Sequence, residues 1–168
     1  MSLIAQAVLA GYFQAIQWFP LGRWNYQPGF TPFAIQLARG GGSAGDFLVL
    51  ASFAIPFLLF WFACSRGLEW LMWICTAGYA IWLALQIKTW WIAYVFGASD
   101  RWREVYGRVF SHATQLLPSF GRHLPPDGMH LVLQVLLVAV VASAVVGLVR
   151  SSGREGRRDH DASSSARL

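Results

Sequence analysis

The sequence predicts an all-α fold, a polytopic membrane protein whose four transmembrane helices form one bundle. Of the 168 residues, 56% are hydrophobic and only 12% are charged, against about 25% charged residues in ordinary soluble domains. The mean hydropathy is +0.46, and four apolar stretches come close to or exceed the roughly 20 residues that a helix needs to cross a bilayer. A soluble domain of this size buries only about 70% of the surface that its unfolded chain exposes. This apolar excess therefore favours a lipid environment.

The first apolar segment covers residues 3–21 and carries three amides. Gln6, Gln14 and Gln17 fall within about 80° of one another on a helix, because each residue advances by about 100°. Such a stripe can form hydrogen bonds with neighbouring helices inside a membrane. The alternative is a helix that lies flat at the membrane surface, which leaves three spans instead of four and separates the two termini.

The second and third segments, residues 46–65 and 68–96, are joined by Arg66 and Gly67 alone. So short a connection predicts an antiparallel helical hairpin. The second segment has no charge after its first residue, and Pro56 in its middle is expected to kink it. The connector between the first two segments, residues 23–45, is rich in Gly and Pro.

Aromatic residues mark both ends of the third segment. Trp70 and Trp91 are 21 residues apart, which is about 32 Å along a helix and matches a hydrocarbon core of about 30 Å. Tryptophan and tyrosine collect at membrane–water interfaces. We therefore expect five membrane-interface anchors: Trp70, Trp73, Trp90, Trp91 and Tyr94.

Residues 99–117 differ from the spans because apolar and charged side chains alternate at helical spacing. Trp102, Tyr106 and Val109 share one face, while Glu104 and Arg108 lie on the other. This pattern predicts one amphipathic helix at the membrane surface or against a partner, ending at Pro118. It precedes the last span.

The last span covers residues 129–149 and contains small residues at every fourth position: Ala139, Ser143 and Gly147. Small residues at this spacing allow two helices to approach closely, although an Ala- and Val-rich helix also produces the pattern by chance. We expect residues 1–150 to form a single transmembrane domain. The polar residues 151–168 are expected to be a disordered basic tail.

Four spans place both termini on one side of the membrane. Basic residues are enriched on the cytoplasmic side, and Arg150, Arg154, Arg157 and Arg158 favour a cytoplasmic location for both termini. Arginines in the opposing loops weaken this bias. We expect a multi-pass protein of the cell membrane, in a bacterial inner membrane.

Lys88 is the single basic residue within a span, and the acidic Asp46 and Glu69 lie only at span ends. Three interpretations remain open for it. Its side chain can extend to the headgroups near Trp90 and Trp91, it can bond to a neighbouring helix, or it can serve a substrate or proton together with Gln86.

Three of the four histidines lie close together in the chain. His112, His123 and His130, with Asp127 between the last two, are suitable ligands for zinc or non-haem iron. Their spacing matches no compact metal motif, so ordinary interfacial histidines are the simpler interpretation. A haem or pigment near the interface, held by His130, is a further alternative. The sequence identifies no cofactor.

No catalytic motif stands in a catalytic context. The letters GxSxG occur at residues 41–45, but they lie in the Gly-rich connector without the preceding strand of a nucleophile elbow, and no phosphate-binding Gly-rich loop is present. The sequence therefore argues against an enzyme and favours a small accessory or assembly subunit of a larger membrane complex. Its expected partners are membrane lipid and other membrane protein subunits. Nucleic acid is not expected, because no basic stripe is interleaved with stacking aromatics. The alternatives are a ligand-binding or redox protein using quinone, haem, pigment or metal near residues 112–130, a small transporter component and a lipid-modifying enzyme.

Overall fold

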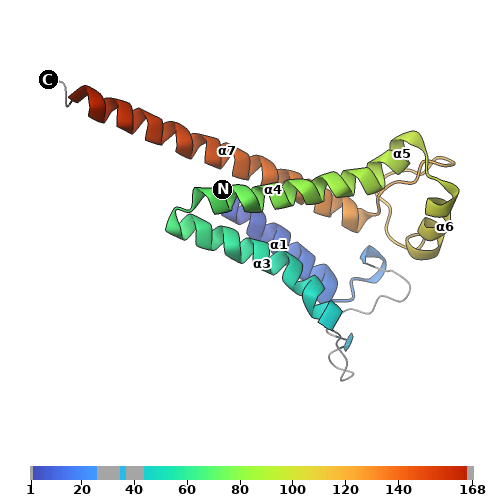
Figure 1. Ribbon diagram of the computed structural model, residues 1–168. Coiled ribbons are helices and arrows are strands. Elements are labelled where there is room, and N and C mark those ends of the chain that lie inside the picture. The colour runs from blue at the N-terminus through green and yellow to red at the C-terminus, as the bar shows by residue number, and fades with distance from the viewer. Residues whose placement is uncertain (1, 26–34, 37–43, 166–168) are drawn as a thin grey trace.

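The computed structural model describes residues 2–25, 35–36 and 44–165 of the chain (Figure 1). Within these residues the regular structure is helical, and the β-type pairing that they contain consists of two isolated bridges. The predicted all-α class is confirmed. Two helical segments in this part of the chain are long and apolar enough to cross a membrane, Glu69–Phe96 and Gly128–Arg150.

The first helix, α1 (Ser2–Trp18), ends three residues before the predicted boundary. Pro20 disfavours helical geometry at the residue before it. Asn25 then closes the helix end: its Nδ2 donates to the carbonyl oxygens of Ile16 at 2.7 Å and Phe19 at 2.8 Å. Its Oδ1 accepts from the backbone of Leu21. A short 3-10 turn, η1 (Gly22–Trp24), follows, and its Trp24 packs against the core cluster. Most of the connector predicted at 23–45 lies outside the described residues.

The hairpin expected around Arg66 and Gly67 is present. It joins α3 (Ala44–Arg66) to α4 (Glu69–Gln86), which pack against each other. Gly67 has φ +66°, and Leu68 N–H donates to the carbonyl of Ala63 at 2.9 Å while Gly67 N–H donates to that of Cys64 at 3.4 Å. This pair of bonds is the Schellman helix end, which requires a left-handed residue.

The third predicted span is one continuous helical segment with a change of winding near its end. After α4 comes a π-helical turn, η2 (Ile87–Trp91), followed by α5 (Ile92–Phe96). Single π-turns inside helices occur frequently at functional sites. This one contains Lys88 together with Trp90 and Trp91. Gly97, with φ +90°, ends the helical segment.

The amphipathic helix is shorter than predicted. α6 (Asp100–Val109) begins where Ser99 Oγ accepts from the backbone of Trp102, and it stops eight residues before the expected end at 117. The backbone beyond it bonds to distant segments: Thr114 N–H donates to Arg23 O at 2.8 Å, and Gly128 N–H donates to Thr114 O at 2.6 Å. These long-range bonds replace the helical ones, so the prediction for 110–117 is wrong. We call residues 97–127 the cap segment.

The last helix, α7 (Gly128–Ser165), extends well past the predicted span. Residues 151–165 continue it as a helix, which differs from the disordered tail that their composition predicted. Extending an existing helix requires no new nucleus. Figure 1 shows this end of α7 projecting beyond the other helices.

The core lies where α1 and α4 pack on α7, with α3 against α1 and α4. Because α7 touches both α1 and α4, one face of it is the most buried surface of the bundle. Its buried residues include Leu137 and Val140, each with 0% exposure. The main apolar cluster consists of Leu9, Phe13, Ile16, Tyr79, Met129, Leu133, Leu137 and Val140.

Candidate functional site

The start of α7 carries a buried acid beside a histidine. Asp127 is 1% exposed, and its Oδ1 accepts from the backbone of His130 at 2.9 Å, as a helix N-cap does. The ring Nδ1 of His130 lies 2.9 Å from Asp127 Oδ2 and 3.0 Å from Oδ1. A carboxylate only accepts, so Nδ1 carries the proton of the neutral ring. Nε2 is then left as an acceptor for a proton, a hydrogen-bond donor or a single metal bond.

Trp90 forms the centre of an aromatic cluster above this pair. Its ring centroid lies 4.5 Å from that of His130, 5.0 Å from Phe110 and 5.6 Å from Trp102. Tyr106 completes the cluster at 6.4 Å. Trp90 is only 3% exposed, so α6 and residue 110 cover it. It therefore does not face lipid as the predicted anchor would.

Two buried polar atoms of this cluster have no hydrogen-bond partner among the residues that the structure describes: the hydroxyl of Tyr106 and the indole Nε1 of Trp102. Burial, together with the smaller effect of the Asp127 charge, raises the pKa of Tyr106 to about 12. A phenol that stays neutral in this position keeps its proton available as a donor. The cluster thus holds two unused donors near the Asp127–His130 pair.

The other two histidines of the predicted set lie elsewhere. His123 Nδ1 lies 2.8 Å from the carbonyl of Tyr94, at the edge of a polar hollow of about 380 Å³ beside Arg122. His112 is exposed, and its backbone carbonyl accepts from Arg23. Within the part of the chain that the structure describes, no group of three or more His, Cys, Asp or Glu side chains is placed to hold a metal ion. Only Asp127 and His130 of the predicted four are brought together.

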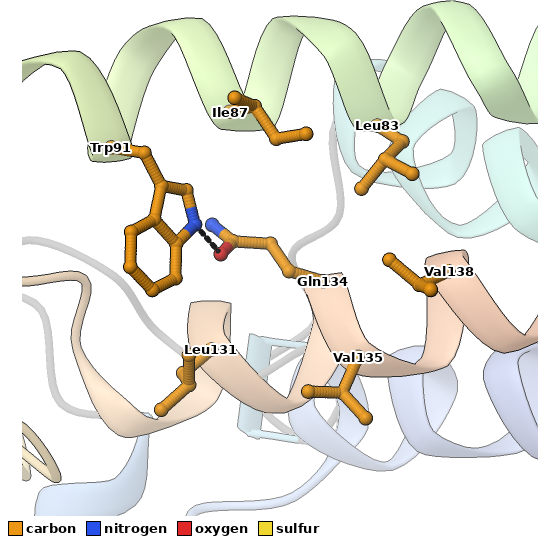
Figure 2. A pocket seen from close by; sticks show the side chains of 7 residues that line it. All are labelled: Leu83, Ile87, Trp91, Leu131, Gln134, Val135 and Val138. Atoms are coloured by element: carbon orange, nitrogen blue, oxygen red, sulfur yellow. Dashed lines mark hydrogen bonds between the residues drawn. The ribbon is translucent and has the colours of Figure 1, made fainter.

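A groove lies between the α4–η2 segment and α7, one helical turn along α7 from His130. Its volume is about 410 Å³, within the range of about 300–1,000 Å³ typical of small-molecule sites. Figure 2 shows its side chains converging from the two helical segments. The lining is apolar except for one amide and one indole: Leu83, Ile87, Trp91, Leu131, Gln134, Val135 and Val138.

Gln134 crosses this groove to meet Trp91. The indole Nε1 donates to Gln134 Oε1 at 2.7 Å (Figure 2). An indole N–H can only donate, so the amide oxygen must face it. Gln134 is 4% exposed, and its Nε2 has no partner among the described residues. A buried amide donor without an acceptor is costly in an apolar setting, which marks this residue as one that a ligand can satisfy.

The predicted intramembrane polar residues are split between the interior and the outer surface. Gln6 is fully buried, and its Nε2 donates to Ser2 Oγ. Gln14 Oε1 accepts from Trp18, and Gln14 and Gln17 are half-buried. Gln86 is half-buried, and its Oε1 has no hydrogen-bond partner in the described part of the chain, whereas Lys88 is exposed. Lys88 therefore does not point into the bundle.

The remaining predicted residues lie mainly at the outer surface. Trp70 and Trp73 are 62% and 43% exposed, as interface anchors require, and Tyr94 is half-buried. On α7, Ala139 and Gly147 are exposed and Ser143 is half-buried. The small-residue stripe is thus not the face that packs inside this chain.

A hydrogen-bonded junction fixes the start of α7, and no local sequence pattern predicts it. Trp24 Nε1 donates to the hydroxyl of Tyr12, which donates to the carbonyl of Met129, both at 3.1 Å. A Cβ on Gly128 would come within 3.0 Å of Trp24 and 3.2 Å of the Thr114 carbonyl. The exceptional burial of Gln134 was also missed, although an amide inside an apolar span is a signal that could have found it.

Comparison with known proteins adds no assignment, since no protein-family model, curated protein or solved structure matches the chain.

Proposed function

We propose that the chain is a multi-pass membrane protein, with α1, α3, the α4–α5 segment and α7 all crossing the bilayer of a bacterial inner membrane. The support is the apolar outer surface of these helices. Soluble proteins rarely expose large contiguous apolar patches. Exposed residues on α3 include Ile55, Leu58, Leu59, Trp61 and Phe62, and those on α4 include Trp70, Trp73, Ile74, Ile81 and Leu85.

The most apolar parts of the two candidate spans support the same proposal. In the most apolar 18-residue stretch of Glu69–Phe96, only 17% of the residues are buried inside the protein, and in that of Gly128–Arg150 only 33% are buried. A core helix of a soluble protein would be mostly buried. Lipid or other membrane subunits are the environments that suit such surfaces.

The connectivity favours a crossing α1 over one that lies flat. Residues 20–25 and the cap segment lie at the same end of the bundle, because Thr114 bonds to Arg23 and Gly128 lies against Trp24. Helices α1, α3, α4 and α7 then alternate in direction. Both termini and the Gly67 turn are expected on the cytoplasmic side, with the cap segment on the other.

Within this membrane setting, we propose a small non-catalytic subunit of a larger membrane complex. The observation that carries this proposal is the apolar exterior of α3 and α4, which the described part of the chain leaves uncovered. Partner helices can cover that surface as well as lipid does.

The test is labelling of single cysteines in intact cells with a membrane-impermeant maleimide. Cys64 and Cys75 are first replaced by alanine. We expect Ser119→Cys in the cap segment to be labelled, and Ser65→Cys beside the Gly67 turn to be labelled only after lysis. Labelling of both sites in intact cells, or recovery of the chain in the soluble fraction, would contradict the proposed topology.

Purification in mild detergent then tests the subunit role. We expect stoichiometric membrane proteins to accompany the chain, identified by mass spectrometry, and to be lost when Leu58→Glu and Ile55→Glu alter the α3 surface. Equivalent changes on the exposed cap segment, such as Ser119→Glu, serve as the control. A chain that purifies alone and stable argues against a subunit.

A second candidate function is ligand binding, and two observations favour it: the α4–α7 groove with its unpaired amide, and the Asp127–His130 pair one turn away. A transporter role gains no comparable support, because Lys88 lies on the outer surface.

A further inference from the structure

We propose that the groove between the α4–η2 segment and α7 binds the head ring of a prenyl quinone, with one quinone carbonyl accepting a hydrogen bond from Gln134 Nε2. This inference deepens the ligand-binding candidate and rests on the proposed membrane location. It concerns binding alone and assigns no electron transfer to the chain.

The first argument is the unused donor. Gln134 Oε1 is held by Trp91 at 2.7 Å, which fixes the amide orientation and leaves Nε2 without an acceptor. In this orientation Nε2 lies between the two helical segments that line the groove (Figure 2), where a ligand can reach it. The site therefore lacks a hydrogen-bond acceptor. The carbonyl oxygen of a ligand can accept from Nε2 without bringing a charge into the apolar groove.

Water is a poor candidate for this acceptor. A buried water usually needs two to four polar partners. Apart from Gln134 and Trp91, the groove is lined by Leu83, Ile87 and other aliphatic residues, and the Trp91 N–H is already engaged. An organic carbonyl on an apolar body satisfies the donor and fills the groove with matching surface.

Depth distinguishes a quinone from a glycerolipid. The apolar part of α7 covers Gly128–Arg150, so its middle is near Ala139. Gln134 lies five residues away, or about 8 Å at about 1.5 Å per residue. The hydrocarbon core extends about 15 Å from the midplane, and the polar interface with its ester groups begins there. Gln134 is too deep for an ester carbonyl, but an uncharged quinone ring can enter the hydrocarbon.

The groove also provides a place for the rest of the molecule. Trp91 forms its polar end, and Val135 and Val138 line it with apolar surface that is 61% and 51% exposed. A head ring at the Gln134 end can contact the indole, while its prenyl tail follows the aliphatic residues toward the membrane centre. The volume of about 410 Å³ fits a ring with the first part of a tail.

The experiment uses the full chain purified in mild detergent, with a photoreactive azido benzoquinone carrying one isoprene unit as the probe. We expect saturable labelling, with the modified peptides containing residues 83–91 or 131–138. Unmodified prenyl benzoquinone should compete with the probe. Gln134→Leu, which keeps the apolar volume but removes the donor, should weaken binding about tenfold.

Two further variants make the result specific. Val138→Trp fills the groove without touching the amide and should abolish labelling. Gln86→Leu removes a half-buried amide at the end of α4 that does not line the groove. This control variant should leave labelling unchanged. Each variant is first required to match the parent in its gel-filtration profile and thermal midpoint in detergent.

Three outcomes overturn the proposal: non-saturable labelling, labelling of other helices, and equal affinity in the parent, Gln134→Leu and Val138→Trp. Retention of a glycerophospholipid that native mass spectrometry detects in the parent, and that Gln134→Leu loses, would assign the groove to an ester lipid instead. These outcomes leave the membrane location intact. That location fails separately, if the cysteine labelling fails.

Discussion

At the scale of single residues, the half-buried Tyr12 and the buried Tyr106 offer a comparison. Tyr12 has both hydrogen bonds, from Trp24 and to Met129, whereas the hydroxyl of Tyr106 has none among the described residues. An unpaired buried hydroxyl contributes no net stability, so its removal is nearly neutral. We expect Tyr106→Phe to change the free energy of unfolding by less than about 0.5 kcal/mol, and Tyr12→Phe to lower it by about 1–2 kcal/mol. Unfolding in mixed micelles, followed by circular dichroism, measures both. Equal losses would show that Tyr106 has a bound partner.

Tyr106 also predicts a dependence on pH. Its folded-state pKa is raised to about 12 from the ordinary value of 10. The folded protein therefore holds this proton more tightly, and the associated stability is fully present below pH 10 and lost as the pH rises toward 12. We expect the thermal midpoint of the parent to fall more steeply above pH 10 than that of Tyr106→Phe. Parallel curves would refute this.

Asn25 closes the end of α1 through three hydrogen bonds, with Ile16, Phe19 and Leu21. Asn25→Ala removes the partner of the buried Ile16 carbonyl and of two part-buried backbone groups, and we expect the free energy of unfolding to fall by about 1–3 kcal/mol. Asn25→Asp, which puts a carboxylate opposite two carbonyls, should not rescue it. An alanine variant as stable as the parent would mean that the helix end is closed in another way.

At the scale of elements, the α3–α4 turn depends on one glycine. Gly67 adopts φ +66°, a conformation that a β-carbon disfavours by about 1–2 kcal/mol. Gly67→Ala should therefore lower the stability by about 1 kcal/mol or more. Gly78→Ala in the interior of α4, where a new Cβ meets nothing within 4 Å, is the control and should stabilise the helix by up to about 1 kcal/mol. Similar effects of the two changes, measured by unfolding, would argue against the Schellman end.

The ends of the helices show which boundaries a local sequence pattern can predict and which it cannot. The hairpin turn follows from Arg66 and Gly67 because a two-residue connection leaves the chain no other path. The end of α6 at Val109 does not follow, because the residues after it bond to Arg23 and Gly128 instead of to their own helix. Helical periodicity in 110–117 was genuine but was overridden by these distant partners.

At the scale of the whole molecule, Gly128 joins three segments far apart in the sequence. A Cβ there would meet Trp24 at 3.0 Å, Thr114 O at 3.2 Å and Leu116 at 3.3 Å. Gly128→Ala should disrupt this junction and lower the free energy of unfolding by about 1–3 kcal/mol. Gly147→Ala on the same helix, with open space around it, should cause no loss. Hydrogen exchange should show that the change at Gly128 loosens the cap segment as well as α7. Loosening confined to α7 would mean that Gly128 does not couple the cap segment to α7.

By itself, the sequence determined the fold class, the positions of the long helices and the exposure of Trp70 and Trp73, because apolar content and helical spacing act over a few neighbouring residues. It also singled out Asp127 and His130 as candidate site residues. Residues three positions apart at the start of a helix lie within one turn of each other. Only the tertiary structure decided that Trp90 is covered by α6, that His112 and His123 lie apart from the pair, and that Gln134 meets Trp91, 43 residues away. Such contacts depend on how helices dock, and docking is set by packing between surfaces that the local sequence pattern does not encode.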